Sequence, residues 1–474
     1  MPLKAVAYVS QSAIGRVTPG LREASLIEWV TPDLVAAQPF VAALNASGFR
    51  VNAVTSPSGT ASALLLAHGL ASSRETLHAD AVAALKINAS QLESQGGTVI
   101  LLQDTGGSFQ PHDHRAWRGG LSGLARTAAR EFAAATIRLI DIDVAGFGTA
   151  LAASHLAEEL LTGGTAPTAG LSPAGRYVPQ DTDFTLPRNQ PGRLGAQDVI
   201  LVTGGARGVT ADCVIELARR TGARFALLGR SEITPWPAGL PVTTDEKALR
   251  GALAKAAKDA GEKITPAALN SRARALLSGA QIRETLDAIA RAGGEAHYIP
   301  ADVSDPTALG AALANIRSQL GEITGLVHGA GVLADKLIRE KTPEQIARVF
   351  GPKIGGLEAL ISQLDTSQLE TVVFFSSVAA RYGNAGQVDY AMANEILNRM
   401  AWWLKSTNPA AAITSINWGP WDGGMVDDGL RAKFAELGVP LISKAAGANA
   451  FADAVLAGAA CPVELVAGAE IAHV

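Results

Sequence analysis

The chain has 474 residues, of which 48% are apolar and 18% charged, a composition typical of a globular protein and not of a disordered one. Its 40 basic and 44 acidic residues give a net charge of −4, so charge offers no support for nucleic acid or an anionic membrane as a partner. The 2 cysteines exclude a disulfide framework and a four-cysteine zinc site. No apolar run is long enough to span a bilayer, and the N-terminus lacks the pattern of a secretory signal. We therefore expect a cytoplasmic protein.

Residues 1–178 alternate short apolar runs with segments of helical length. Continuous apolar runs of this kind are typical of parallel strands that are buried on both faces. Apolar residues at helical spacing over 117–132 predict one helix that covers the sheet. We expect strands at residues 4–9, 51–54, 63–67, 98–103 and 137–143.

A stretch rich in Pro, Gly, Asp and Asn, residues 179–197, predicts a linker before a second region, 198–474, with the same alternation. Between its second and third strands such a fold needs one helix, so the longer stretch 232–294 predicts extra helices on the outside. The pattern predicts an α/β fold of two Rossmann-like, doubly wound parallel-sheet subdomains, the first without a cofactor turn. In the second we expect strands at 199–202, 225–228, 296–300, 325–328, 372–375 and 414–417.

A glycine-rich turn follows the first strand of the second region and opens a helix. Glycine permits a tight turn and lets the backbone approach a pyrophosphate at the helix N-terminus. An ordinary βα loop is the alternative, and the βαβ context favours a dinucleotide site. The residues expected to bind the cofactor here are Thr203, Gly204, Gly205, Arg207, Gly208 and Val209.

The end of the second strand indicates which dinucleotide is bound. An acidic residue that would bind a ribose 2′-hydroxyl is missing there, and Arg230 and Ser231 occupy the place. Arg230 and Arg207 suit a 2′-phosphate, which favours NADPH over NADH, although Arg230 could also be a solvated loop charge. Further cofactor contacts are expected after the third and fourth strands, without a proton-transfer role for the histidine among them: Asp302, Val303, His328, Gly329, Ala330 and Gly331.

Ser377 ends a predicted strand, and Tyr390 lies 390 − 377 = 13 residues later, in a helical stretch. This layout resembles the short-chain dehydrogenases/reductases, in which the tyrosine protonates an alkoxide and the serine orients the carbonyl. Most of that family has a lysine four residues after the tyrosine, where this chain has Asn394. In ketoreductases of modular polyketide synthases the lysine and asparagine exchange places, and Lys353, 377 − 353 = 24 residues before Ser377, fits that arrangement. The resemblance implies a catalytic tetrad of Lys353, Ser377, Tyr390 and Asn394, with Lys353 and Tyr390 also contacting the cofactor.

The resemblance covers nearly the whole chain. Residues 1–178 are similar to the structural subdomain of those ketoreductases, and segments 204–213, 328–336 and 417–426 are similar to ketoreductases of polyunsaturated fatty acid synthases. Pro420, in the last segment, is expected among the cofactor contacts. Thr210 replaces the third glycine of the general reductase fingerprint. We expect a stand-alone chain of two subdomains.

The resemblance implies NADPH-dependent reduction of a 3-oxoacyl thioester, bound to an acyl carrier protein, to the 3-hydroxyacyl thioester in polyketide or fatty acid biosynthesis. One alternative is a reductase of free ketones or aldehydes. Another is a catalytically silent synthase partner, which predicts a damaged tetrad or cofactor turn. A homodimer is left open. No metal site is predicted, because His112 and His114 lie in a polar loop without a cluster of ligands.

Three residues are expected to contact the substrate. Related reductases that form a (3R) alcohol carry Leu-Asp-Asp after the fourth strand, where this chain retains only the final acid, Asp335. Those that form a (3S) alcohol carry a Trp eight residues before the tyrosine, where this chain has Tyr382. We therefore predict the (3R) product; Asp335 could instead cap the following helix, and Tyr382 could pack against the loop. Met425 lies where relatives carry a mobile helix and is expected to face the acyl chain.

Overall fold

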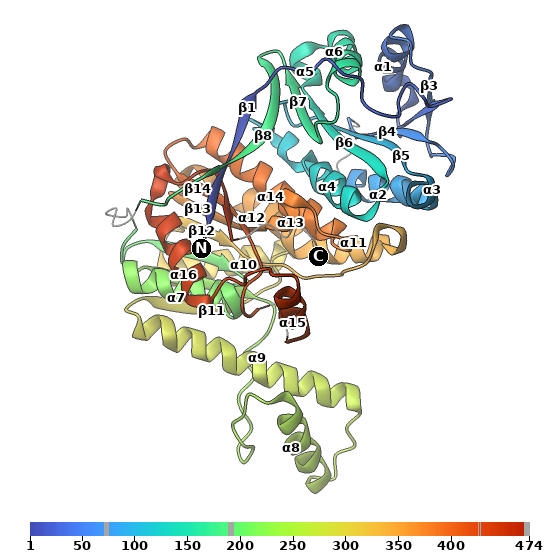
Figure 1. Ribbon diagram of the computed structural model, residues 1–474. Helices are drawn as coiled ribbons and strands as arrows, with labels where there is room; N and C mark the ends of the chain where they lie inside the picture. Colours follow the sequence, from blue (N-terminus) through green and yellow to red (C-terminus); the bar gives the residue numbers. More distant parts are fainter. Residues whose placement is uncertain (71–74, 188–193, 425, 427, 469–474) are drawn as a thin grey trace.

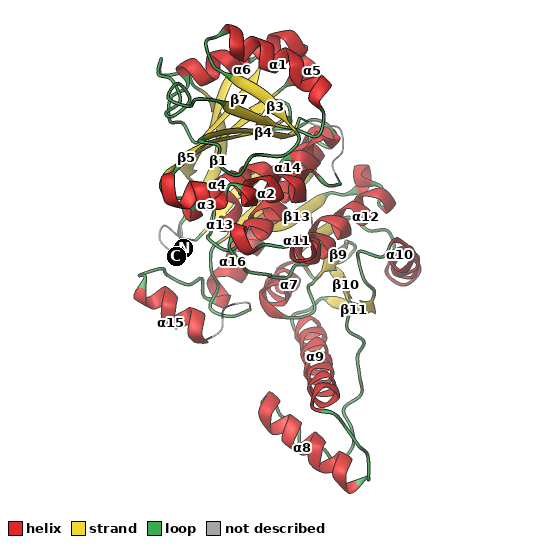
Figure 2. Ribbon diagram, turned by 90° about the vertical axis from the view of Figure 1, so that its right-hand side faces the viewer, coloured by secondary structure: helices red, strands yellow, loops and turns green. Residues whose placement is uncertain are grey.

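One continuous sheet of 15 strands organises the protein, as the computed structural model shows for residues 1–70, 75–187, 194–424, 426 and 428–468 (Figure 1). The strand order is β11-β10-β9-β12-β13-β14-β15-β1-β8-β7-β6-β5-β4-β2-β3. Helices cover the sheet, and the apolar core lies between the two layers (Figure 2). This arrangement confirms the predicted Rossmann-like α/β fold and adds that the two sheets are joined. No helix within these residues is both long and apolar enough for a membrane span.

The C-terminal half contains seven parallel strands, β9 to β15, and the order of the first six, 3-2-1-4-5-6, is that of a dinucleotide-binding sheet. Six of them were predicted; the seventh, β15, was not. The strands are β9 Val199–Thr203, β10 Arg224–Gly229, β11 Glu295–Pro300, β12 Gly325–His328, β13 Thr371–Ser377, β14 Ala412–Trp418 and β15 Glu464–Ala467. The main helices are α7 Gly208–Thr221, α10 Pro306–Leu320, α11 Pro343–Phe350, α12 Gly356–Gln363, α13 Val378–Tyr382, α14 Val388–Thr407, α15 Asp428–Glu436 and α16 Lys444–Leu456.

The N-terminal half contains the five predicted strands and three more, β2, β7 and β8. Strands β2 to β7 are parallel, and β8 is antiparallel to β7. The strands are β1 Leu3–Ser10, β2 Ile27–Val30, β3 Val51–Val54, β4 Ala63–Gly69, β5 Gly97–Gln103, β6 Ala135–Ile142, β7 Thr168–Ser172 and β8 Gly175–Asp183. The helices are α1 Leu34–Ala46, α2 Leu77–Ile87, α3 Ala89–Gln95, α4 Leu121–Glu131, α5 Val144–Phe147 and α6 Thr149–Thr162.

Strand β1 joins the two halves, because it pairs antiparallel with β15 on one side and with β8 on the other (Figure 1). The pairing of Lys4 with Asp183 extends β8 to Asp183, so residues 179–183 of the expected linker are part of the sheet. Leu186 and Leu194 are buried in the core of the C-terminal half. This segment is therefore packed against the sheet on both sides of residues 188–193.

The helix expected over 117–132 is two elements, a 3₁₀ turn at His114–Arg118 and α4. Gly119 and Gly120 separate them, and a side chain on Gly119 would collide with Arg399 of α14. A side chain on Gly123 would meet the backbone of Ala391, also in α14, at 2.5 Å. These glycines let α4 of the N-terminal half pack closely on the helix that carries Tyr390.

The extra helices expected in 232–294 are α8 Glu246–Asp259 and α9 Pro266–Arg291. Helix α8 lies at the far end of α9, away from both halves (Figures 1 and 2). Its buried residues, Leu249 and Leu253, form a small apolar cluster with Ala273 and Leu276 of α9. The other end of α9 contacts β11 and α7.

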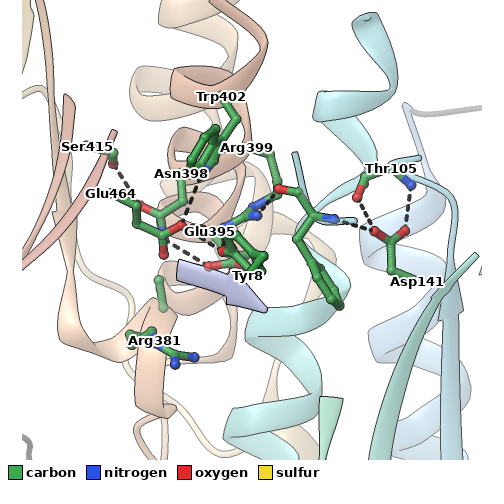
Figure 3. Close-up of polar contacts among 12 residues, drawn as sticks. Tyr8, Thr105, Asp141, Arg381, Glu395, Asn398, Arg399, Trp402, Ser415 and Glu464 are labelled. Carbon is green, nitrogen blue, oxygen red and sulfur yellow. Dashed lines mark hydrogen bonds and ion pairs between the residues drawn. The ribbon is translucent and has the colours of Figure 1, made fainter. Parts of the chain in front are cut away.

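A buried polar cluster lies at the junction of the two halves (Figure 3). Arg399 of α14 donates to the carboxylate of Glu464 at 2.7 Å and also to the Tyr8 hydroxyl and the Phe109 carbonyl. Tyr8 donates to Glu464 at 2.8 Å, and Glu395 lies 3.4 Å from Arg399. The cluster thus connects α14 and β15 with β1 and with a loop of the N-terminal half.

Candidate active site

The four residues of the expected tetrad come from three elements beside the end of β13. Ser377 is the last residue of β13, Tyr390 and Asn394 lie one turn apart on α14, and Lys353 lies in a π-helical turn, η3, at Gly351–Gly355. The Lys353 ammonium donates to Asn394 Oδ1 at 2.9 Å, and Asn394 Nδ2 donates to the Tyr390 carbonyl at 2.8 Å. The structure therefore brings the tetrad together, with Asn394 between Lys353 and the first turn of α14.

Lys353 is a buried cation. Its side chain donates a second hydrogen bond, to the Phe375 carbonyl at 2.9 Å, and its ammonium lies 5.6 Å from the centre of the Tyr390 ring. The residue is 2% exposed, and this burial lowers its pKa from 10.5 to about 7. The charge of Lys353 is therefore sensitive to pH in the neutral range.

Tyr390 is held in its protonated form. Burial raises the pKa of its hydroxyl, hydrogen bonding with Asn394 and Ser377 opposes this rise, and the Asp335 carboxylate adds to it. The Ser377 hydroxyl accepts from the Ala379 N–H at 3.1 Å, which orients it at the start of α13. A protonated phenol beside an oriented hydroxyl can donate a proton to an oxygen atom that the hydroxyl holds in place.

The glycine-rich turn between β9 and α7 has the shape that a pyrophosphate needs. Gly204 and Gly208 have φ angles of +71° and +67°, which glycine adopts without strain. A Cβ on Gly208 would meet no other group within 4 Å, so the backbone there is open. No side chain caps α7 at Arg207, which leaves its first N–H groups available to an anion. The residues present therefore fit a dinucleotide.

His328 is a structural residue in the described geometry. Its Nε2 lies 2.8 Å from the Lys353 carbonyl, which can only accept, so Nδ1 accepts from the Thr203 hydroxyl at 2.8 Å. Burial and the nearby Lys353 charge lower its pKa to about 3. The neutral ring ties the ends of β9 and β12 to the turn that carries Lys353.

The glycine missing at Thr210 is compensated elsewhere. Thr210 is buried, and a side chain on Gly329 would meet its hydroxyl at 2.8 Å. The space that the family pattern provides on α7 is provided here at the end of β12. Gly331 leaves similar room for Lys353, whose Cε would lie 3.0 Å from a Cβ at that position.

Helix α9 supports the glycine-rich turn from outside. The Thr285 hydroxyl donates to the Ala206 carbonyl at 2.9 Å, and the Arg207 guanidinium donates to the Ser278 hydroxyl at 3.1 Å. Both hydroxyl-bearing residues are buried. Neither was predicted, because a serine and a threonine in a long helix carry no distinctive signal.

The other expected cofactor residues lie around this turn at the ends of the strands. Arg230 is exposed, and with a hydrogen bond from Ser304 as the larger cause it lowers the pKa of Asp302. Val303 is buried in the core, so its side chain is not available to a ligand. The Ser231 carbonyl accepts from the Tyr298 hydroxyl at 2.5 Å, and the Pro420 carbonyl accepts from the Ile442 N–H at 2.8 Å.

Comparison with known proteins agrees with this geometry. Residues 199–423 match the family model of the KR domain. This part of the chain is a ketoreductase domain. It belongs to the polyketide-synthase type and has the fold of the short-chain oxidoreductases.

The relatives are much longer proteins. The chain is 38% identical over 287 residues to a polyunsaturated fatty acid synthase of Thraustochytrium sp., a match that covers 58% of this chain and 10% of the synthase. It is 38% identical over 146 residues to polyketide synthase PksM of Bacillus subtilis, covering 31% of this chain and 3% of that one. The chain thus matches a tenth or less of the length of these relatives.

Solved structures share the fold over both halves. An A-type ketoreductase from a modular polyketide synthase aligns with a TM-score of 0.73 at 20% identity, covering 99% of this chain and 93% of that one. A ketoreductase domain from the bacillaene assembly line aligns with a TM-score of 0.69 at 19% identity, covering 98% and 96%. The fold of the N-terminal half is therefore shared as well.

The expected substrate residues of the ketoreductase differ in their surroundings. The Asp335 carboxylate accepts from Gln387 at 3.0 Å and therefore does not cap the helix that follows. The Tyr382 hydroxyl donates to Asp181 of β8 at 2.7 Å. Met425 lies outside the described residues.

A buried ion pair beside Tyr390 was not predicted from the sequence. The Lys341 ammonium lies 3.0 Å from both carboxylate oxygens of Asp389, and neither side chain is exposed. Asp389 directly precedes Tyr390, which is the one signal that could have suggested a role. Nothing in the sequence pairs it with a lysine 48 residues away.

Proposed function

We propose that this chain reduces the 3-oxo group of an acyl thioester, carried by an acyl carrier protein, to a (3R)-hydroxyl group with NADPH. The observation that carries the proposal is the hydrogen-bonded series from Lys353 through Asn394 to the turn of Tyr390, next to an open glycine-rich turn. The names of the relatives, a polyunsaturated fatty acid synthase and a polyketide synthase, support an acyl thioester as the substrate. The intact tetrad and turn argue against a silent partner.

The residues divide the chemistry among them. NADPH would supply the hydride, held by the glycine-rich turn and with its 2′-phosphate near Arg207 and Arg230. Ser377 would hold the carbonyl oxygen, and Tyr390 would give it the proton. Lys353 would stabilise negative charge on the Tyr390 oxygen once the proton has left, and Asn394 fixes the ammonium for that task.

The test is NADPH oxidation with a panel of 3-oxoacyl carrier-protein thioesters beside free ketones and aldehydes. We expect turnover of the thioesters, a (3R) product by chiral chromatography, and a roughly ten- to hundredfold preference for NADPH over NADH from charge-assisted contacts to the 2′-phosphate. Equal turnover of free ketones would favour a reductase of free carbonyl compounds. An unchanged cofactor preference in Arg230→Ala would contradict the role of that residue.

Tyr390→Phe tests the proton donor. We expect turnover to fall by roughly 10²–10⁴ while NADPH affinity stays nearly unchanged, because only proton donation is lost. Tyr177→Phe, which changes a tyrosine on β8 of the other half, is the matched control and should retain full activity. Wild-type rates in Tyr390→Phe would refute the assignment.

A further inference from the structure

Two loops flank the Tyr390 hydroxyl on the side away from the glycine-rich turn. The first, residues 331–341, follows β12 and carries Asp335, whose charge raises the pKa of Tyr390. The second, residues 383–389, leads from α13 into α14. The Lys336 N–H donates to the Gly386 carbonyl at 2.8 Å, and Gln387 donates to Asp335 at 3.0 Å. The loops therefore contact each other at the backbone and through side chains.

A carboxylate from the N-terminal half bridges these two loops. Glu131, the last residue of α4, accepts from the Ile338 N–H at 2.7 Å with one oxygen and from the Gly386 N–H at 2.9 Å with the other. Hydrogen bonds to a charged acceptor are short and strong compared with neutral ones. One side chain of the N-terminal half thus sets the separation of the first loop from the second.

The buried ion pair adds a connection on the other side. Lys341 donates to the Ala334 carbonyl at 2.7 Å as well as to Asp389, and Asp389 accepts from the Tyr390 N–H at 2.9 Å. A displacement of the first loop would therefore be transmitted to the first turn of α14. Since that turn carries Tyr390, the position of the proton donor depends on the loops.

We propose that Glu131 is a positioning residue, which fixes the two loops that border the acyl-substrate side of the site. The proposal rests on the proposed function for the identity of that substrate, but the bridge itself does not. Glu131 touches neither Tyr390 nor the glycine-rich turn in the described contacts. Its loss should therefore affect the substrate side and spare cofactor binding.

Glu131→Gln tests the proposal, because the amide keeps the size of the side chain but presents an NH₂ group to one of the two N–H donors. We expect KM for the thioester to rise roughly three- to tenfold, as the loss of one such hydrogen bond implies, with the NADPH dissociation constant unchanged. Amide hydrogen exchange should become faster in residues 331–341 and 383–390. Glu93→Gln is the matched control, because Glu93 pairs with exposed Arg339 of the same loop, 3.1 Å away, through a side chain only.

Each outcome decides between separate statements. If the wild-type protein reduces no 3-oxoacyl thioester, the proposed function fails, and faster exchange in Glu131→Gln still supports the bridge. If the wild-type protein is active and Glu131→Gln matches Glu93→Gln in KM and in exchange, the bridge is refuted. A parallel loss of NADPH affinity would also refute it, since the residue would then act on the whole fold. If Glu131→Gln does not fold, the shorter Glu131→Asp, measured in the same way, replaces it.

Discussion

At the scale of single residues, the charge of Lys353 controls how the tetrad responds to pH. Burial lowers the pKa of its ammonium to about 7, whereas the pKa of Tyr390 is raised, so the two groups lose their protons in separate ranges. Below about pH 7 Lys353 is charged, and above it Lys353 becomes neutral while Tyr390 keeps its proton. The cation that stabilises the phenolate is therefore the group that is lost first as pH rises.

We expect kcat/KM for thioester reduction to fall as pH rises through about 7, because the fraction of charged Lys353 falls there. The measurement is a pH profile from mildly acidic to mildly alkaline solution. Lys353→Arg keeps its charge over this range, so its remaining activity should show no such fall. A wild-type profile that stays flat well into the alkaline range would contradict this role of Lys353.

At the scale of elements, α9 and α4 support the site although neither carries a catalytic residue. Helix α9 holds the glycine-rich turn through Thr285 and Ser278, and α4 approaches α14 closely because Gly119 and Gly123 have no side chains. Both helices lie behind the residues that would contact ligands. Their contribution is to the geometry of the turn and of the first turns of α14.

Thr285→Val should weaken NADPH binding roughly three- to tenfold, because it removes the hydrogen bond to the Ala206 carbonyl at nearly constant size. Turnover at saturating NADPH should change little, since the tetrad is untouched. Thr162→Val in α6 is the matched control, because that hydroxyl bonds only within its own helix, to Glu158, on the other half. Binding measured by titration in both variants checks the prediction, and equal affinities would contradict it.

The elements that could be predicted from the sequence are those with a continuous apolar run. Strands such as β3 and β12 were predicted at their observed bounds. Strands β2 and β15 were missed because each has four residues and contains a buried glutamate, Glu28 or Glu464, which interrupts the pattern. The partner of Glu464 is Arg399, 65 residues earlier, so only the fold explains its burial.

The site could be predicted in part for the same reason. Ser377, Tyr390 and Asn394 have a recognisable spacing within a short segment, and the structure brings them together with Lys353. The residues that position them come from distant parts of the chain. Glu131 meets Gly386 across 255 residues, and no local pattern records that contact.

At the scale of the whole molecule, the first strand of the chain lies in the middle of the sheet. Because β1 pairs with β15 and with β8, neither half has a free sheet edge at the junction. Arg381 of α13 adds an ion pair with Asp181 of β8 at 2.8 Å, and Arg399 reaches Tyr8 and Phe109 from α14. The same helices carry the catalytic residues and the contacts to the N-terminal half, so we expect the two halves to unfold together.

Arg399→Met tests this expectation, because it leaves Glu464 and Glu395 buried without their cation (Figure 3). Removing one partner of a buried ion pair costs about 3–5 kcal/mol, so the free energy of unfolding should fall by about that amount. Arg219→Met is the matched control: its pair with Glu216 lies within α7, with Arg219 61% exposed, and such exposed pairs contribute about 0–1 kcal/mol. Urea unfolding followed by hydrogen exchange in β4 and β5 and in β12 and β13 should give one shared midpoint, which shifts in Arg399→Met. Separate midpoints for the two halves, or a shift no larger than that of Arg219→Met, would show that the junction does not couple them.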